Sequence, residues 1–319
     1  MKILAPCIAI AAANVLLALA LTVGEISWLG FIASILEWLV LIASIGTLAL
    51  AYAMMRTLRS GEPLIQGLRQ RISDNRDRLK IVAVGLAISV PVHSSSNILK
   101  QRLNDLYPFW ADRMLADWDA AIFGTDPGQW LHSVLGPAAI GFLDFTYTLW
   151  FPINALCFIA CLFYGRKRLL LAYFLLWGLC APMGQILMSS AGPLFWPYLD
   201  YGDRFDSLIA DVSFGPTFAA RYLWLTFNAD VMRFGAGIAA VPSMHVAGAA
   251  WVALCTYPTR LFPLGLLYFV LVSVGSVALG WHYAVDGIIG GACSMSMLGI
   301  ASIYFAKPSR SGERVRSTC

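Results

Sequence analysis

The chain has 319 residues, of which 59% are hydrophobic and only 13% are charged, with a formal net charge of +4. A soluble domain carries about 25% charged residues, so this composition excludes an ordinary soluble protein and indicates an integral membrane protein. The basic residues flank apolar segments instead of forming one patch, so the charge does not point to a nucleic-acid partner. Six of the seven cysteines lie inside apolar runs and none has metal-ligand spacing beside a histidine, so we interpret them as buried apolar residues.

Apolar segments long enough to cross a bilayer recur along the whole chain. A spanning helix needs about 20 mostly apolar residues. The sequence therefore predicts an all-α, polytopic membrane helix bundle with these spans: 5–23, 28–55, 78–97, 138–163, 168–190, 241–258, 262–281 and 284–306. The first run follows Lys2 and is also compatible with a cleaved signal peptide. Its length and the lack of a convincing cleavage site favour a retained helix.

The basic residues are distributed asymmetrically between the connections. They concentrate in alternate connections and in the tail: 56–80, 166–168, Arg260 and 307–316. Basic loops stay on the cytoplasmic side, so threading the spans places both termini in the cytoplasm. We expect a bacterial inner membrane, with residues 98–137, 191–240 and 281–283 on its outer face.

Two of these outer segments have distinctive compositions. Residues 107–132 are rich in Trp, Phe and Asp at helical spacing, which predicts one amphipathic helix lying at the membrane interface. Residues 191–204 combine prolines and aromatic residues, which indicates a rigid loop at the membrane surface.

A short motif, PSMH at residues 242–245, lies at the outer edge of an apolar run. Pro242 can occupy the first turn of a helix, where a missing N–H has no cost. The unpaired N–H groups near Ser243 would then point outward with the positive end of the helix dipole and form a seat for a phosphate. Ser243 could add a hydroxyl donor, and His245 would stand over the same anion.

A second motif, HYAVD at residues 282–286, lies at the edge of the last span. His282 and Asp286 are four residues apart, so on a helix they share one face. A carboxylate bonded to one imidazole nitrogen fixes the tautomer and leaves the other nitrogen as a base or nucleophile. Together with His245 and a helix N-terminus, these groups could supply the nucleophile, acid and positive charge that phosphoryl transfer requires.

Other interpretations of these motifs stay open. A single His or Asp at a helix end is commonly a cap or an interfacial anchor. A metal site with two histidines and one carboxylate is also possible, although no further acidic ligand lies in the motifs. A transporter could use the same polar groups, but matched halves with interrupted helices are not evident.

The sequence resembles the type-2 phosphatidic acid phosphatase superfamily, whose signature is K-x6-RP, then PSGH, then SR-x5-H-x3-D. PSMH matches the second block, and His282-x3-Asp286 matches the end of the third. PSMHVA followed by GWHYAVDG is most similar to the inositol-phosphotransferase branch, typified by inositol phosphorylceramide synthase. The resemblance covers residues 78–306. It implies a six-helix catalytic membrane domain there, preceded by a two-helix extension with a basic loop at 1–77 and followed by a basic tail at 307–319.

Three cations of the superfamily pattern are missing. Gln185-x6-Gly192-Pro193 takes the place of K-x6-RP, and Gly275-Ser276 takes the place of Ser-Arg. Since a phosphate still needs neutralising, other outer-face cations should replace them. The candidates are Lys100, Arg102, Arg204, Arg221 and Arg233. The K-x6-YP spacing from Lys100 to Pro108 is far from PSMH in sequence, and we interpret it as a coincidence. Arg204, Arg221 and Arg233 are equally compatible with solvated loop charges.

The resemblance also implies a mechanism. His282, oriented by Asp286, attacks a phospholipid phosphorus and forms a phosphohistidine, while His245 protonates the leaving oxygen and then activates the acceptor. The acceptor is a lipid hydroxyl in a head-group transferase or water in a lipid phosphatase. The altered blocks favour the transferase. No cofactor and no metal are implied.

Overall fold

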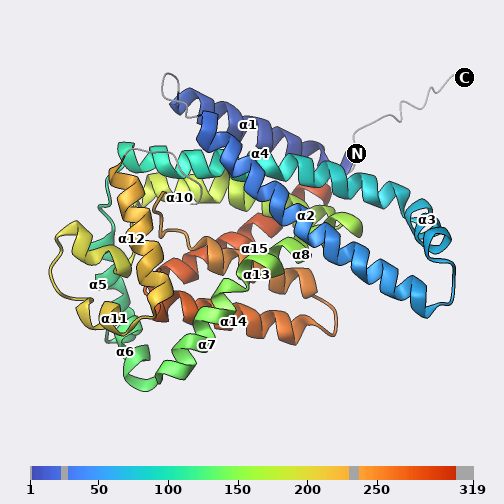
Figure 1. The fold of residues 1–319 in the computed structure, drawn as a ribbon. Helices are drawn as coiled ribbons and strands as arrows, with labels where there is room; N and C mark the ends of the chain where they lie inside the picture. The colour runs from blue at the N-terminus through green and yellow to red at the C-terminus, as the bar shows by residue number, and fades with distance from the viewer. Residues whose placement is uncertain (1, 23–27, 230–236, 307–319) are drawn as a thin grey trace, which may run out of the picture.

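The structure is a computed structural model that describes residues 2–22, 28–229 and 237–306. Over these residues it is helical and contains no β-strand, which confirms the all-α fold. The long helices run along a common direction (Figure 1).

The helices fall into three groups. The N-terminal group consists of η1 (Lys2–Leu4), α1 (Ala5–Leu21), α2 (Trp28–Arg59) and α3 (Leu64–Asp74). The bundle consists of α4 (Arg76–Leu106), α7 (Pro137–Thr148), α8 (Trp150–Phe163), α9 (Lys167–Leu175), the π-helical η2 (Leu176–Cys180), α10 (Ala181–Leu187), α13 (Met244–Thr256), α14 (Phe262–Ala278) and α15 (Ala284–Ala306). The remaining short helices are α5 (Asp112–Phe123), α6 (Pro127–Val134), η3 (Pro193–Leu199), α11 (Asp206–Asp211) and α12 (Phe214–Asn228).

Many of these helices have the length and composition of membrane spans. Four stretches are long and apolar enough to cross a bilayer: Arg76–Leu106, Pro137–Phe163, Lys167–Leu187 and Ala284–Ala306. Shorter apolar helices are α1, α13 and α14. Together with α2, they fall on the predicted segments, so the chain is a multi-pass membrane protein.

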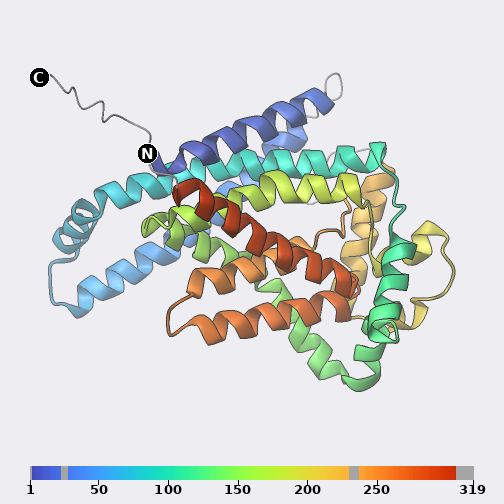
Figure 2. The same cartoon turned by 180° about the vertical axis from the view of Figure 1, so that it is seen from behind.

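The short helices gather at one end of the bundle. Helices α5, α6, α11 and α12 lie together there, whereas α3, the start of α1 and the end of α15 lie at the opposite end (Figures 1 and 2). This arrangement places the described parts of the long predicted outer segments on one side, and the start of α1 and the end of α15 on the other. We call the first side the α5 end.

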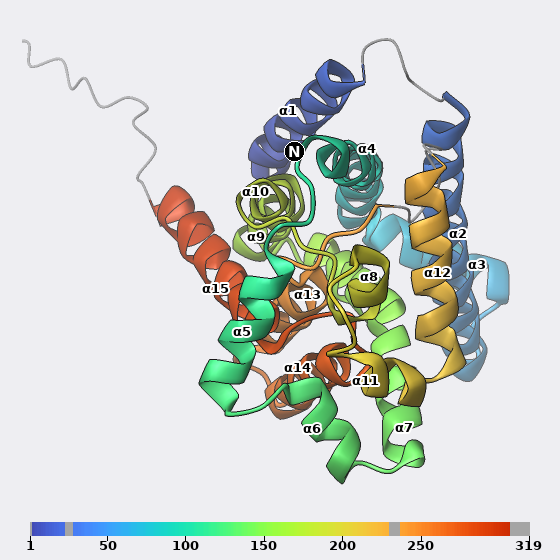
Figure 3. The same ribbon diagram turned by 90° about the vertical axis from the view of Figure 1, so that its left-hand side faces the viewer.

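Helix α13 lies at the centre of the bundle. In an end-on view it is surrounded by α8, α9, α14 and α15 (Figure 3). Its residues 246–253 are all buried, and Gly248, Ala249 and Ala250 let the neighbouring helices approach closely. A helix that is apolar on every side belongs in the interior. The Trp251 indole, which is fully buried, donates a hydrogen bond to the Leu169 carbonyl at 2.9 Å.

The predicted single helix over residues 107–132 is wrong in detail. The segment forms two helices, α5 and α6, because Gly124 ends α5 in the left-handed conformation (φ 75°) and Pro127 begins α6. The first of them is amphipathic, with Leu115 buried and Trp118 exposed. Residues 191–204 contain the 3₁₀ helix η3, whose Phe195 and Trp196 are buried, so this segment is packed into the α5 end.

Candidate active site

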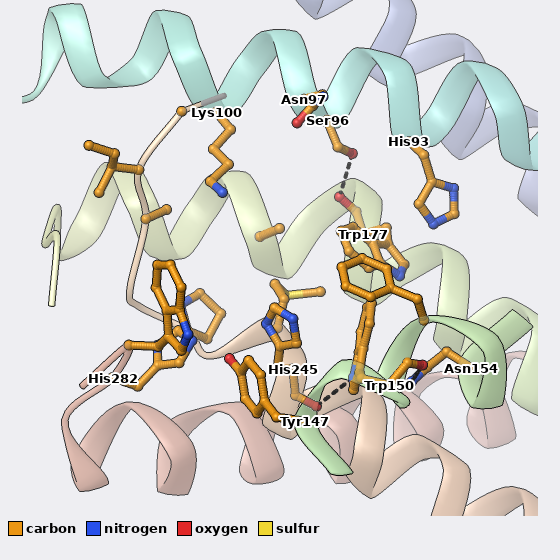
Figure 4. Close-up of a pocket in the computed structure, with 18 of the residues that line it drawn as sticks. His93, Ser96, Asn97, Lys100, Tyr147, Trp150, Asn154, Trp177, His245 and His282 are labelled. Atoms are coloured by element: carbon orange, nitrogen blue, oxygen red, sulfur yellow. Dashed lines mark hydrogen bonds between the residues drawn. The ribbon is translucent and has the colours of Figure 1, made fainter. Parts of the chain in front are cut away.

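The PSMH and HYAVD motifs meet where α13 and α15 begin. The backbone N–H of Ser243 donates to the carbonyl of Asp286 at 3.3 Å. Gly290, one turn further along α15, packs on this junction, because a Cβ there would come within 2.5 Å of the Ser243 carbonyl oxygen. The imidazole rings of His245 and His282 consequently lie with their centroids 6.3 Å apart (Figure 4).

Aromatic side chains hold His245 in position. The Tyr147 ring stacks on the imidazole at 4.4 Å with an interplanar angle of 20°. The Trp150 ring lies 4.6 Å from the imidazole, and its indole N–H donates to the His245 carbonyl at 2.8 Å. The side chain of His245 therefore has little rotational freedom, and one edge of the ring is directed at the cavity described below.

Asp286 lies behind His282. Its Oδ2 is 3.7 Å from Nδ1 of His282, which is ion-pairing distance and longer than a hydrogen bond. The same Oδ2 accepts the backbone N–H of Tyr283 at 3.0 Å, which anchors the carboxylate. Asp286 is fully buried and His282 is 6% exposed. With Nδ1 facing the carboxylate, the other ring nitrogen of His282 is the one that could act as a base or nucleophile.

Two carboxylates of α5 brace the segments that carry the site. Asp119 accepts the N–H groups of Ala284 (2.6 Å) and Val285 (2.9 Å) at the start of α15. Asp112 accepts the N–H of Gly192 at 2.8 Å and that of Ala191, together with the hydroxyl of Tyr283 at 2.9 Å. Helix α5 thus ties the start of α15 to the 191–192 segment.

These two carboxylates lie outside the spanning helices and are strongly affected by burial. Burial raises the pKa of Asp112 to about 6, against the opposing effect of its hydrogen bonds from Gly192 and Ala191. Burial likewise raises the pKa of Asp119 to about 6. Both side chains are at most 3% exposed. At neutral pH the carboxylates are therefore ionised at a free-energy cost that the backbone donors offset in part.

A cavity of about 650 Å³ opens between the histidines and α4. His245, His282, Tyr147 and Lys100 lie on its wall at the α5 end (Figure 4). It follows α4 inward as far as Leu86, which is about 21 Å from Lys100 at 1.5 Å per residue. Most of the remaining wall is apolar or aromatic, and α4 adds the polar side chains of Ser89, His93, Ser96 and Asn97 between Lys100 and Leu86.

Comparison with known proteins identifies the family. A family model described as the PAP2 superfamily matches residues 113–301, which is more than half of the chain. The chain belongs to this superfamily. Its members are phosphatases and phosphotransferases that act on lipid phosphates, so the protein is an enzyme of this type and not the transporter considered above. No match was found among curated proteins or among solved structures.

Of the predicted phosphate-binding cations of this PAP2 protein, Lys100 lines the cavity. Arg102 is on the same helix and pairs with Asp105 at 3.2 Å. Arg221 is exposed on α12 and does not line the cavity. Arg233 lies outside the described residues.

Arg204 has a different environment from the one predicted. Its guanidinium pairs with Asp126 at 2.8 Å and with Asp117 at 2.7 Å, and it donates to the Ala116 carbonyl. It links the loop before α11 to α5 and α6, and it does not line the cavity. Because two carboxylates already neutralise this cation, the structure gives it a role in holding the α5 end together.

The start of α13 differs from the prediction. The helix begins at Met244, so Pro242 precedes it and does not occupy its first turn. Ser243 is the N-cap, and its hydroxyl accepts the N–H of Val246 at 3.3 Å. The serine is fully buried and does not line the cavity, whereas Pro242, Met244 and His245 do. The N-terminus of α13 therefore faces the cavity with its serine occupied in capping.

Several residues of the site were not singled out from the sequence. Tyr147 and Trp150 belong to a predicted span and carry no motif, so the sequence does not connect them with His245. Asp112 and Asp119 are seven residues apart, a spacing that places them on one helix face. That spacing indicates that the two carboxylates contact the same side of the helix's surroundings, although it does not show which groups they bind.

Proposed function

We propose that this PAP2-superfamily enzyme is a lipid phosphotransferase that moves a phospho-head group, of the inositol-phosphate type, to a lipid hydroxyl. The observation that carries the proposal is a single cavity with both histidines on its wall and Lys100 facing them (Figure 4). A phosphoryl group between the imidazoles would have a nucleophile, an acid and a cation within one small volume.

The proposed reaction has two balanced steps. In the first, the free ring nitrogen of His282 forms a bond to phosphorus, the bond from phosphorus to the leaving lipid oxygen breaks, and His245 delivers its proton to that oxygen. In the second, His245 takes the proton of the acceptor hydroxyl, the acceptor oxygen bonds to phosphorus, and the phosphorus–nitrogen bond breaks. Asp286 stabilises the positive charge that develops on His282.

Lys100 is the proposed replacement for the missing cations. Gln185 occupies the position of the superfamily's first lysine, and its side-chain N–H donates to the Lys100 carbonyl at 2.7 Å and also to the Asn104 side chain. Gln185, which replaces the superfamily's lysine, therefore holds in place the turn of α4 that carries Lys100. The Lys100 side chain points from α4 into the cavity (Figure 4). An ammonium there would neutralise a phosphate oxygen across from the histidines.

The apolar and aromatic side chains that make up most of the inner wall favour a lipid acceptor over water. Phe151, Phe158, Ile159 and Leu86 line the inner part of the cavity, which would accommodate a hydrocarbon chain beside the reacting phosphate. Exclusion of water protects a reactive phosphohistidine from hydrolysis. These features support a transferase over a phosphatase.

The predicted topology is part of this proposal. We place the α5 end at the outer face and both termini in the cytoplasm of a bacterial inner membrane, as the basic connections indicate. We also retain the division into an extension (1–77), a catalytic membrane domain (78–306) and a basic tail (307–319). The match at 113–301 falls within the proposed catalytic domain.

The test uses the full chain in detergent–lipid micelles with phosphatidylinositol labelled in its phosphate, with and without ceramide. Label should move to ceramide in the wild type, and His282→Ala should reduce transfer by at least about 1000-fold because the nucleophile is gone. His132→Ala, which removes an imidazole outside the cavity, is the matched control. Brief reaction and alkaline denaturation should leave acid-labile label on the wild type alone.

Two outcomes would change the proposal. Release of labelled inositol phosphate without transfer to ceramide would make water the acceptor, and release of inorganic phosphate from labelled phosphatidic acid would assign the chain to lipid phosphatases. Full activity of the His282→Ala variant would overturn the role of His282.

A further inference from the structure

Tyr147 combines a catalytic neighbour with an unused polar group. It lies in the last turn of α7, and its ring stacks on His245. The side chain is 7% exposed, yet it lines the cavity. Its hydroxyl is directed toward the part of the cavity where His282 lies (Figure 4).

The hydroxyl of Tyr147 is buried and has no hydrogen-bond partner among the described residues. A buried polar group without a partner costs free energy, so such an atom in a native site calls for an explanation. Two other buried, unpartnered atoms belong to residues on the cavity wall, Nδ1 of His282 and Oδ1 of Asn154. The first faces Asp286, and the second is an acceptor that would repel an anion. The Tyr147 hydroxyl, in contrast, can donate a hydrogen bond to an anion.

Tyr147 also lies beside the residue that precedes a cation position of the superfamily pattern. Gly275-Ser276 replaces the Ser-Arg pair of the third block, and a Cβ on Gly275 would be 3.8 Å from Cδ2 of Tyr147. Ser276 is fully buried, and its hydroxyl donates to the Ser273 carbonyl at 2.8 Å. Ser276 therefore provides no charge, and the neighbouring helix contributes a phenol close by.

We infer that the Tyr147 hydroxyl is a phosphate ligand, which donates a hydrogen bond to a non-bridging oxygen of the phosphoryl group held between His245 and His282. This inference rests on the proposed function. The stacked ring fixes the hydroxyl relative to the imidazole, so one side chain orients the acid and contacts the phosphate.

The substitution of a phenol for a guanidinium suits a particular substrate class. A phosphodiester carries one negative charge, whereas a phosphomonoester carries close to two at neutral pH. Lys100 is the one Lys or Arg among the described residues that line the cavity. One cation with a neutral donor matches a phosphodiester such as a phospholipid head-group linkage, and a dianionic monoester would be left under-neutralised.

The test is Tyr147→Phe, which keeps the stacking ring and removes only the hydroxyl. The matched control is Tyr268→Phe, because the Tyr268 hydroxyl is also buried and unpartnered but does not line the cavity. The readouts are kcat/KM on a phosphodiester lipid, the affinity for orthovanadate as a phosphate-like anion, and Tm. We expect Tyr147→Phe to lower kcat/KM and vanadate affinity about 10- to 100-fold, since the lost bond goes to a charged group. Its Tm should be unchanged or higher, because no folded partner is lost.

The possible outcomes separate this inference from the proposed function. Wild-type kcat/KM and vanadate affinity in Tyr147→Phe, or an equal loss in Tyr268→Phe, would overturn the ligand role and leave the phosphotransferase intact. A wild type that neither turns over phosphodiesters nor binds vanadate would overturn both. Vanadate binding that depends on Tyr147, without turnover, would support the ligand role and reject the reaction.

Discussion

The two walls of the cavity are built in different ways. One wall comes from the starts of α13 and α15, where PSMH and HYAVD are joined by the Ser243–Asp286 backbone hydrogen bond and braced by the carboxylates of α5. The opposite wall comes from Lys100 on the long helix α4, with Gln185 holding its turn. The first wall is a set of short connections, whereas the second is a continuous helix that contributes one cation, Lys100.

The difference follows from what each wall has to do. Proton transfer and nucleophilic attack require the two histidines and Asp286 to keep fixed relative positions. The side chains and the backbone that carries them are therefore constrained together. Neutralising a phosphate needs only a donor or a cation at the right distance, and any element that reaches the cavity can supply it. The motif wall therefore matches the superfamily pattern, and we propose that the phosphate-binding cation has moved to Lys100.

The largest effect should come from the motif wall. Asp286→Asn keeps the shape of the side chain but removes the charge that orients and stabilises His282, so kcat should fall by about 1000- to 10,000-fold. The rate of transfer of labelled head group to ceramide measures this fall in kcat. Asp144→Asn is the control, because Asp144 also lines the cavity but accepts a hydrogen bond from Ser213. A loss of less than tenfold in Asp286→Asn would mean that the carboxylate is structural.

A smaller effect should come from the opposite wall. Lys100→Met preserves the length and removes the charge, and we expect kcat/KM for a phospholipid donor to fall about 100-fold, largely through KM. Lys80→Met makes the same change at the other end of α4, where Lys80 pairs with Asp77 at 3.2 Å on the surface. Lys100→Arg should retain part of the activity. Unchanged KM in Lys100→Met would leave the phosphate without its proposed cation.

The smallest effect concerns the bracing of the motif wall. The pKa of Asp112 and that of Asp119 are about 6 in the folded protein, above the value of 3.8 for a free side chain. The folded state therefore binds protons more tightly than the unfolded state, and the contribution to stability present below pH 4 is lost as the pH rises through 6.

Thermal unfolding of the solubilised protein between pH 4 and pH 7 measures this linkage. Tm should decrease with rising pH in the wild type, and the slope should flatten in Asp112→Asn and in Asp119→Asn. A wild-type slope retained in both variants would assign the pH dependence to other groups.

Sequence patterns predicted the helices better than their ends. Apolar runs located the spans because each must satisfy its own backbone in lipid. Helix starts were less certain: α13 begins at Met244 instead of near Pro242, since a capping serine competes with a proline for the first turn. The break at Gly124 was missed because the aromatic spacing continues through it.

The class of the protein and the motif residues follow from the sequence alone, because they depend on hydrophobicity and on short spacings along one helix. The sequence could not rank Lys100 above the arginines or bring forward Tyr147, since those residues lie in apolar helices or loops without a motif. Only the tertiary structure decided that Lys100 faces His245 and His282 across the cavity while Asp126 and Asp117 occupy Arg204. The physical reason is that a phosphate site is a matter of charges and donors converging in space, and helix packing sets that convergence.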